Sequence, residues 1–366
     1  HIQDCAFMAQ KTVKGKYFAN YAFFDKSMHD KMLWEKKIEN TFDEALAGDQ
    51  FQLYIQPKVD MTTGRIIGGE ALVRWMQPEA GMIPPGEFIP VLEQTDLIYD
   101  VGEWVLKTAV RQCKKWRKYR PDFHISVNVS HVQFQDNEMV EFVLKTLEEA
   151  DLPGEALTLE MTESIQLQDF QHYNKIFYKL ERHGIQIAID DFGSGYSNLS
   201  YLKNLAVDEI KIVRDFVSRI QHSAYNYRLL SNMIELAHSA DIRVCCEGVE
   251  TEEELLTIRE LHPDLYQGFL FSKPYSVEQL ERKYFKNTNE DYIKCRQQAA
   301  YYQSLAYSVE TEGKELVEQE KLSIIVDSME ELVYVRDTYS YDLLYLNDAG
   351  REITGVYDYR GRKCYE

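Results

Sequence analysis

The sequence lacks the features of secreted, membrane-spanning and nucleic-acid-binding proteins. Its six cysteines form no CxxC pair and no metal-finger spacing, so neither disulfides nor zinc fingers are predicted. No apolar run approaches the length that spans a bilayer, and no secretory signal is recognisable. The net charge of -19 would repel the phosphate backbone of a long nucleic acid. These absences predict a reduced, cytoplasmic protein that neither inserts into a membrane nor binds polymeric nucleic acid.

The composition is typical of a globular protein. Of the 366 residues, 45% are hydrophobic and 28% are charged. That length accommodates one barrel-sized domain with additional segments, or two ordinary domains. A small anionic ligand is compatible with the acidic balance if bound cations neutralise the charge locally.

The central part of the sequence repeats a short β-rich run followed by a helical pattern. From the second run onward, long segments with helix-like spacing separate the runs, and residues 101–119 are one example. This alternation predicts an α/β fold, a TIM-like (β/α)8 barrel, with a doubly wound open sheet as the main alternative. The expected strands are 51–58, 65–74, 123–129, 156–161, 185–190, 209–213, 242–247 and 265–271.

The first two expected strands make this barrel irregular. Only residues 60–64 join them, which is too short for a parallel crossover connection. We therefore expect an antiparallel hairpin, and a barrel with one antiparallel strand.

The flanking segments differ from the barrel and predict partial α/β modules. Residues 17–24 look strand-like, 25–47 form a charged helical pattern, and 275–322 look helical and charged. Two alternating runs, 332–336 and 343–346, predict short strands near the C-terminal end. The expected division is 1–30 for an N-terminal module remnant, 31–50 for a linker helix, 51–282 for the barrel, 283–322 for a helical connector and 323–366 for a partial module.

Acidic and amide side chains fall near the ends of the expected strands. The carboxyl ends of parallel strands open on one face of a barrel, so these side chains should converge there. Alone, each acid is more often a helix cap or a surface charge, and an Asp pair before glycine is also typical of a turn. The residues concerned are Glu70, Asn128, Glu160, Asp190, Asp191 and Glu247, with Lys211 inside the sixth strand.

Such a cluster predicts a site for divalent cations. Five carboxylates in one cleft repel each other unless cations lie between them. Oxygen ligands favour Mg²⁺ or Mn²⁺, whereas zinc prefers His or Cys. Two such ions, bridged by Asp190 or Asp191, activate a water and stabilise the leaving oxygen of a phosphodiester. Lys211 is a candidate for orienting the water or offsetting phosphate charge.

Eight short motifs occur in one order over about 220 residues. They are Gln56-Pro57, EALVR at 70–74, Asn128-Val129-Ser130, EMTE at 160–163, DDFGSGYS at 190–197, Lys211-Ile212, EGVE at 247–250 and Gln267-Gly268-Phe269. In this combination the sequence closely resembles the EAL-domain family of cyclic di-GMP phosphodiesterases. The resemblance implies hydrolysis of cyclic di-GMP to the linear dinucleotide 5′-pGpG, two Mg²⁺ or Mn²⁺ ions, inhibition by Ca²⁺, and a homodimer.

The resemblance also implies roles for individual residues. The implied metal residues are Glu70, Asn128, Glu160, Asp190, Asp191 and Glu247. The implied catalytic residues are Glu70, Lys211, Glu247 and Glu163, with Lys211 assisting the attacking water and Glu163 anchoring the 190–197 loop. The implied substrate-binding residues are Gln56, Leu72, Arg74 and Gln267, with Arg74 on a phosphate and Gln267 beside the reacting one.

One residue departs from the family pattern, and the flanks resemble other families. The family usually has an acidic residue where this sequence has Val213, which shares a strand face with Lys211. This departure leaves open the alternative of a weak or silent cyclic di-GMP receptor that relays a signal to attached domains. Residues 4–24 resemble the end of a GGDEF domain without its signature residues, and 323–364 resemble the first half of a PAS domain.

Overall fold

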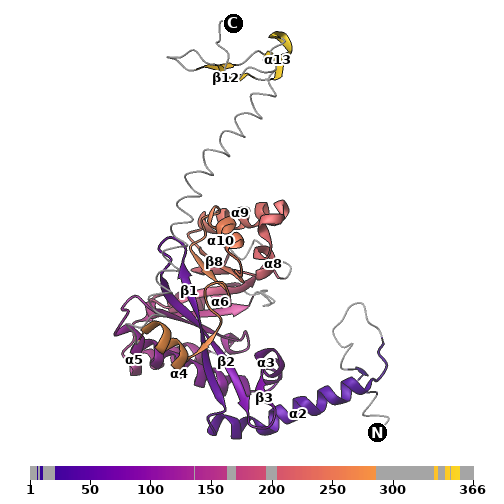
Figure 1. Ribbon diagram of the computed structural model, residues 1–366. Coiled ribbons are helices and arrows are strands. Elements are labelled where there is room, and N and C mark those ends of the chain that lie inside the picture. The colour runs from indigo at the N-terminus through magenta and orange to yellow at the C-terminus, as the bar shows by residue number, and fades with distance from the viewer. Residues whose placement is uncertain are drawn as a thin grey trace. The chain divides into compact units, whose positions relative to one another are not determined.

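The computed structural model describes residues 6, 9–10, 21–135, 137–162, 170–194, 204–285, 334–336, 343–346 and 348–354. The chain divides into two compact units, His1–Ala299 and Ala300–Glu366. The first unit contains a closed β-barrel with helices around it (Figure 1). Within the described residues, no helix has the length and apolarity needed to cross a bilayer.

Eight strands form the barrel, as the sequence predicts. Around the barrel, β1 is antiparallel to both β2 and β9, and every other neighbouring pair is parallel. The TIM-like barrel with one antiparallel strand is therefore confirmed, and the open-sheet alternative is wrong. The strands are β1 (Phe51–Asp60), β2 (Ile66–Gln77), β4 (His124–Asn128), β5 (Leu157–Thr162), β6 (Gln186–Phe192), β7 (Glu209–Ile212), β8 (Arg243–Glu247) and β9 (Leu265–Gln267).

The hairpin between β1 and β2 closes through a side-chain-capped turn. Asp60 Oδ1 accepts hydrogen bonds from the backbone N–H and the hydroxyl of Thr63, each at 2.6 Å. Gly64 follows with a φ of 62°, a conformation that glycine adopts without steric cost. This local chemistry reverses the chain in the short connection. Two short edge strands, β3 (Gly81–Ile83) on β2 and β10 (Tyr275–Ser276) on β1, lengthen the sheet.

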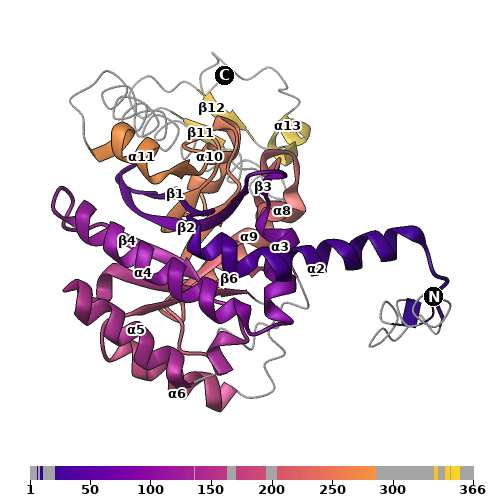
Figure 2. The same cartoon turned by 90° about the horizontal axis from the view of Figure 1, so that it is seen from below.

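Helices pack on the outside of the barrel strands, as Figure 2 shows for α4, α5 and α6. The expected helix at 101–119 is α4, which buries one apolar face that includes Val105, Ala109 and Trp116. The helices of this unit are α2 (Lys26–Ala47), α3 (Pro85–Glu93), α4 (Leu97–Arg117), α5 (Asn137–Ala150), α6 (Phe170–Glu181), α8 (Arg214–Val217), α9 (Ala224–His238), α10 (Glu252–Arg259) and α11 (Val277–Leu280), followed by a π-helical turn at Glu281–Phe285.

The N-terminal flank is partly as expected. The helical pattern at 25–47 is α2, which begins at the cap residue Asp25. Phe42 of α2 packs against Phe51 and Trp75 of the β1–β2 hairpin. The strand expected at 17–24 is wrong over its described part, Tyr21–Phe24, because a strand needs a hydrogen-bonded neighbour and none pairs with these four residues in the described structure.

The second unit contains the two short strands expected near the C-terminal end. β11 (Tyr334–Arg336) and β12 (Leu343–Leu346) pair in an antiparallel ladder, and α13 (Asp348–Thr354) follows. Most of the expected connector, from residue 286 onward, lies outside the described residues.

Candidate active site

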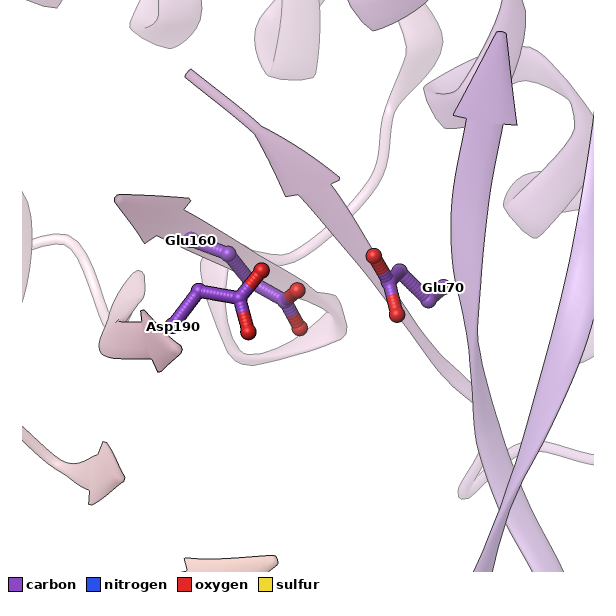
Figure 3. Close-up of side chains that lie close together, drawn as sticks. All are labelled: Glu70, Glu160 and Asp190. Carbon is purple, nitrogen blue, oxygen red and sulfur yellow. The ribbon is translucent and has the colours of Figure 1, made fainter. Parts of the chain in front are cut away.

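Carboxylates from different strands meet at one end of the barrel. Oxygen atoms of Glu70, Glu160 and Asp190 lie within 4.8 Å of one another, and so do oxygen atoms of Asp190, Asp191 and Glu247. Figure 3 shows the first three side chains directed toward a common space from separate strands. The parallel register explains this convergence, since it aligns strand ends that are far apart in sequence.

A register shift places two consecutive acids at the same site. Successive side chains of a regular strand point to opposite faces, which would separate Asp190 from Asp191. The pairing of β6 with β7 shifts between Ile189 and Phe192, and Asp191 has a φ of 55°. This bulge turns the backbone so that both carboxylates lie near Glu247.

Lys211 lies at the centre of the acidic cluster. Its side chain is 1% exposed, so its ammonium interacts with protein groups rather than bulk water. Burial opposes its charge, but the surrounding acids raise the pKa of Lys211 well above its ordinary value. Its Nζ atom lies 2.7 Å from Glu160 Oε2, 2.8 Å from Glu247 Oε1, 3.0 Å from Asp190 Oδ1 and 3.1 Å from Glu70 Oε2.

One lysine does not compensate this many acids. Burial would raise the pKa of Glu160, yet Lys211 and Lys58 overcome it and hold that pKa at about 2. For Glu247, burial prevails over Lys211 and, with the nearby acids, raises the pKa to about 8. Burial likewise raises the pKa of Glu70 and of Asp190. The cluster therefore favours additional positive charge, and its oxygen donors suit Mg²⁺ or Mn²⁺.

Two amide side chains hold the orientation of Glu70. Asn128 Nδ2 donates to Glu70 Oε1 at 2.7 Å, and Gln267 Nε2 donates to Glu70 Oε2 at 2.9 Å. Gln56 pairs with Glu70 across the hairpin and donates from Nε2 to the Ser272 carbonyl at 3.2 Å. Of the three amides expected from the sequence, Asn128 and Gln267 thus donate to Glu70, and Gln56 lies opposite it on the neighbouring strand.

A pocket of about 590 Å³ adjoins the acids, within the size range of small-molecule sites. Leu72 and Arg74 line it from β2, and Asn128 and Asp191 line its acidic end. Arg74 is half-buried, donates to the Val73 carbonyl and lies over the Tyr54 ring. The walls contributed by α3 and α4 carry no sequence motif and are mostly apolar, with Glu93 as a charged exception. Their apolar residues include Ile89, Pro90, Ile98, Val101 and Val105.

Two further features expected from the sequence are the 190–197 loop with its proposed anchor Glu163, and the departure from the family pattern at Val213. Glu163 and residues 195–197 of the expected 190–197 loop lie outside the described residues. Val213 is buried at the position that precedes α8, and its side chain makes no cap hydrogen bond to that helix. An apolar side chain therefore occupies the position where the family pattern has an acid, just beyond the end of β7.

Three further charged residues extend the cluster into the barrel interior. Lys58 contacts Glu160 and Glu209, and Glu209 contacts Arg243. None of the three belongs to a motif, but the alternation of residues along the first strand indicated one of them. Lys58 has the same strand parity as Gln56, so the sequence places a charged residue on the inward face of β1.

The comparisons with known proteins agree with this geometry. The family model described as EAL domain matches residues 39–274. MucR of Pseudomonas aeruginosa, a bifunctional diguanylate cyclase/cyclic di-GMP phosphodiesterase, is 38% identical over 261 residues, which cover 71% of this chain and 38% of MucR. The cyclic di-GMP phosphodiesterase PA2567 of the same species is 34% identical over 231 residues, which cover 63% of this chain and 39% of the relative. The chain thus spans less than half the length of these relatives.

Solved structures share the barrel. The PaMucR phosphodiesterase in complex with c-di-GMP aligns with a TM-score of 0.63 and 38% identity, over 67% of this chain and 99% of that chain. An EAL-domain protein from Listeria monocytogenes aligns with a TM-score of 0.60 and 28% identity, over 67% of this chain and 97% of the other. Sequence, fold and site geometry agree, and this chain belongs to the EAL-domain family.

Proposed function

We propose that this protein hydrolyses cyclic di-GMP to linear 5′-pGpG with the help of two Mg²⁺ or Mn²⁺ ions. The observation that carries the proposal is the ring of four carboxylates around Lys211, beside the pocket that Leu72 and Arg74 line. Relatives named as cyclic di-GMP phosphodiesterases, and the c-di-GMP complex of PaMucR, support the choice of substrate.

The residues that would hold the cations share oxygen donors and positions at the strand ends; they are Glu70, Asn128, Glu160, Asp190, Asp191 and Glu247. When bound, two such ions supply Lewis acidity that polarises a phosphoryl oxygen and lowers the pKa of water. The larger and more flexibly coordinated Ca²⁺ would fit the same oxygens with poorer geometry and inhibit.

The chain's own groups orient the substrate and the attacking water. We assign Arg74 to a phosphate, and Leu72 and Gln56 to the cleft beside it. Lys211 would direct an N–H toward the water. The water oxygen bonds to phosphorus, the bond from phosphorus to the 3′ oxygen breaks, and a proton from the water ends on the 3′ oxygen as a hydroxyl. We also assign Gln267, which donates to Glu70, to the reacting phosphate. We retain Glu163 as the proposed anchor of the 190–197 loop.

The alternative is a receptor that binds cyclic di-GMP without turning it over. Buried Val213 favours it, because an apolar side chain there removes a polar contact near Lys211. In either case we propose that the chain comes from a cytoplasmic, homodimeric sensor-regulator. Its GGDEF-like segment would precede the barrel, and its PAS-like segment would follow it.

Hydrolysis assays distinguish the two functions. Protein incubated with cyclic di-GMP and Mg²⁺ should yield linear product, separable by chromatography, and EDTA should stop the reaction. Glu70→Ala should abolish turnover because it removes a ligand oxygen and the acceptor of two amides. Glu103→Ala is the matched control, since Glu103 is an exposed acid paired with Lys107 on α4. Tight binding without product would establish the receptor instead.

A further inference from the structure

A second buried lysine lies beneath the acidic cluster. The Lys58 side chain on β1 is 0% exposed, and its Nζ atom lies 2.7 Å from Glu160 Oε1 and 2.8 Å from Glu209 Oε1. Both partner side chains are also 0% exposed. Protein groups enclose the Lys58 side chain completely, so any effect it has on the site passes through its two carboxylate partners.

Lys58 belongs to a series of alternating charges that runs through the barrel. Arg243, whose side chain is 32% exposed, lies 3.1 Å from Glu209 Oε2. Glu209 contacts Lys58, Lys58 contacts Glu160, and Glu160 contacts Lys211 in the acidic cluster. The series thus connects a partly exposed arginine with a proposed metal ligand.

Stability alone does not account for this arrangement. Removing ions from water is costly, and apolar side chains of similar volume often stabilise a core as well as a buried ion pair or better. On the neighbouring strands, the buried positions on the same face as Glu160 hold small or polar side chains, Ser126, Thr158 and Ala188, rather than further charges. A role at the adjacent acidic cluster explains why charged side chains occupy this part of the barrel interior.

The two oxygens of Glu160 have separate partners. Oε1 accepts from Lys58 at 2.7 Å, and Oε2 accepts from Lys211 at 2.7 Å within the acidic cluster. Because Lys58 is held by Glu209 on its other side, it cannot follow Glu160 if that carboxylate rotates. We therefore expect the contact between Glu160 Oε1 and Lys58 to persist when Oε2 exchanges Lys211 for another partner.

We infer that Lys58 is a positioning residue for the candidate cation site: it holds Glu160 so that Oε2 faces the cluster. The inference rests on the proposed function, in which Glu160 is a metal ligand. Partners of a metal ligand fix its orientation, and their loss typically weakens metal affinity by about 10–100-fold. The role is thus measurable by metal binding alone, without turnover.

The test compares variants by titration with Mn²⁺, with the free ion followed by electron paramagnetic resonance. In Lys58→Met alone two effects on the Kd for Mn²⁺ oppose each other, because the variant removes a positive charge near the cluster together with the partner that positions Glu160. It also leaves the buried Glu209 with Arg243 alone, which endangers folding. The double variant Lys58→Met/Glu209→Gln removes that uncompensated charge and should recover the wild-type unfolding temperature in EDTA. Because the deleted pair carries no net charge, its Kd for Mn²⁺ should rise by about tenfold or more through the loss of positioning.

Two controls isolate the effect on Glu160. Glu209→Gln alone leaves Lys58 on Glu160 and should keep a Kd close to the wild-type value. Lys114→Met removes an exposed lysine, paired with Asp151 outside the barrel, and should change nothing. A folded double variant that binds Mn²⁺ as tightly as the wild type would overturn the inference. Wild-type protein that binds Mn²⁺ but forms no product would refute the proposed function and leave the role of Lys58 supported by a raised Kd.

Discussion

Replacement of Lys211 by methionine should separate metal binding from catalysis. Lys211 is the cation that four carboxylates share, and its side chain is 1% exposed. A divalent cation at those carboxylates would compete with its ammonium. Removing the ammonium should therefore destabilise the metal-free protein, strengthen metal binding and impair turnover, three effects that simple misfolding does not combine.

The size of each effect follows from the burial. Breaking a buried ion pair costs about 3–5 kcal/mol. In a domain of this size each kcal/mol lowers Tm by about 2–4 °C. The Tm of the variant in EDTA should therefore fall by about 6–20 °C. Unit charges about 4 Å apart interact by about 4 kcal/mol at an effective dielectric constant of about 20, so Mn²⁺ affinity should rise at least about tenfold.

The assay is thermal unfolding at pH 8, where the acids of the cluster are most ionised, in EDTA and in saturating Mg²⁺. The variant should gain more from Mg²⁺ than the wild type, because binding stabilises in proportion to affinity. Turnover should remain low in saturating metal. An unchanged Tm in EDTA, or a weaker affinity for Mn²⁺ in the variant, would refute the assigned position of Lys211. Lys114→Met provides the exposed-lysine control.

Two other predictions concern pH and packing. Because the pKa of Glu247 is about 8 when folded and 4.5 ordinarily, the folded metal-free protein binds the extra proton, and its free energy of unfolding should fall as pH rises from 7 to 8. His124, with a pKa of about 4 when folded against 6.5 ordinarily, acts with the opposite sign below pH 6.5, so urea titrations in EDTA should show the fall only above that range. Gly68→Ala should destabilise by about 1–3 kcal/mol, since the added Cβ would lie 2.7 Å from the His124 carbonyl oxygen; in urea titrations Gly86→Ala, which meets no atom within 4 Å, should change stability little.

The sequence predicted the barrel because its strands have a strong local signal. Each strand is a short β-rich run, and the short link at 60–64 excluded a parallel crossover between the first two. The convergence of Glu70, Glu160 and Asp190 followed from the topology, since parallel strands end on the same face. The short strands β3 and β10 were not expected, because two or three residues carry too little pattern.

Other features depend on tertiary contacts that no local pattern encodes. The apolar pocket wall comes from α3 and α4, whose residues have ordinary helix-face spacing. The bulge that aligns Asp190 with Asp191 depends on the register between β6 and β7. Lys58 and Glu209 are separated by 151 residues and meet only inside the closed barrel.

The distribution of charge in the barrel gives a reason for a cation at its acidic end. Below the cluster, positive and negative side chains alternate from Arg243 through Glu209 and Lys58 to Glu160, so each carboxylate there has a basic partner. At the acidic end, Lys211 is the one basic side chain within ion-pair distance of Glu70, Asp190 and Glu247 among the residues that the structure describes. Burial raises the pKa of each of these three acids, whereas basic partners hold the pKa values of Glu160 and Glu209 below their ordinary values. The deficit of positive charge thus lies with the carboxylates around Lys211, and a divalent cation bound there would supply the missing charge.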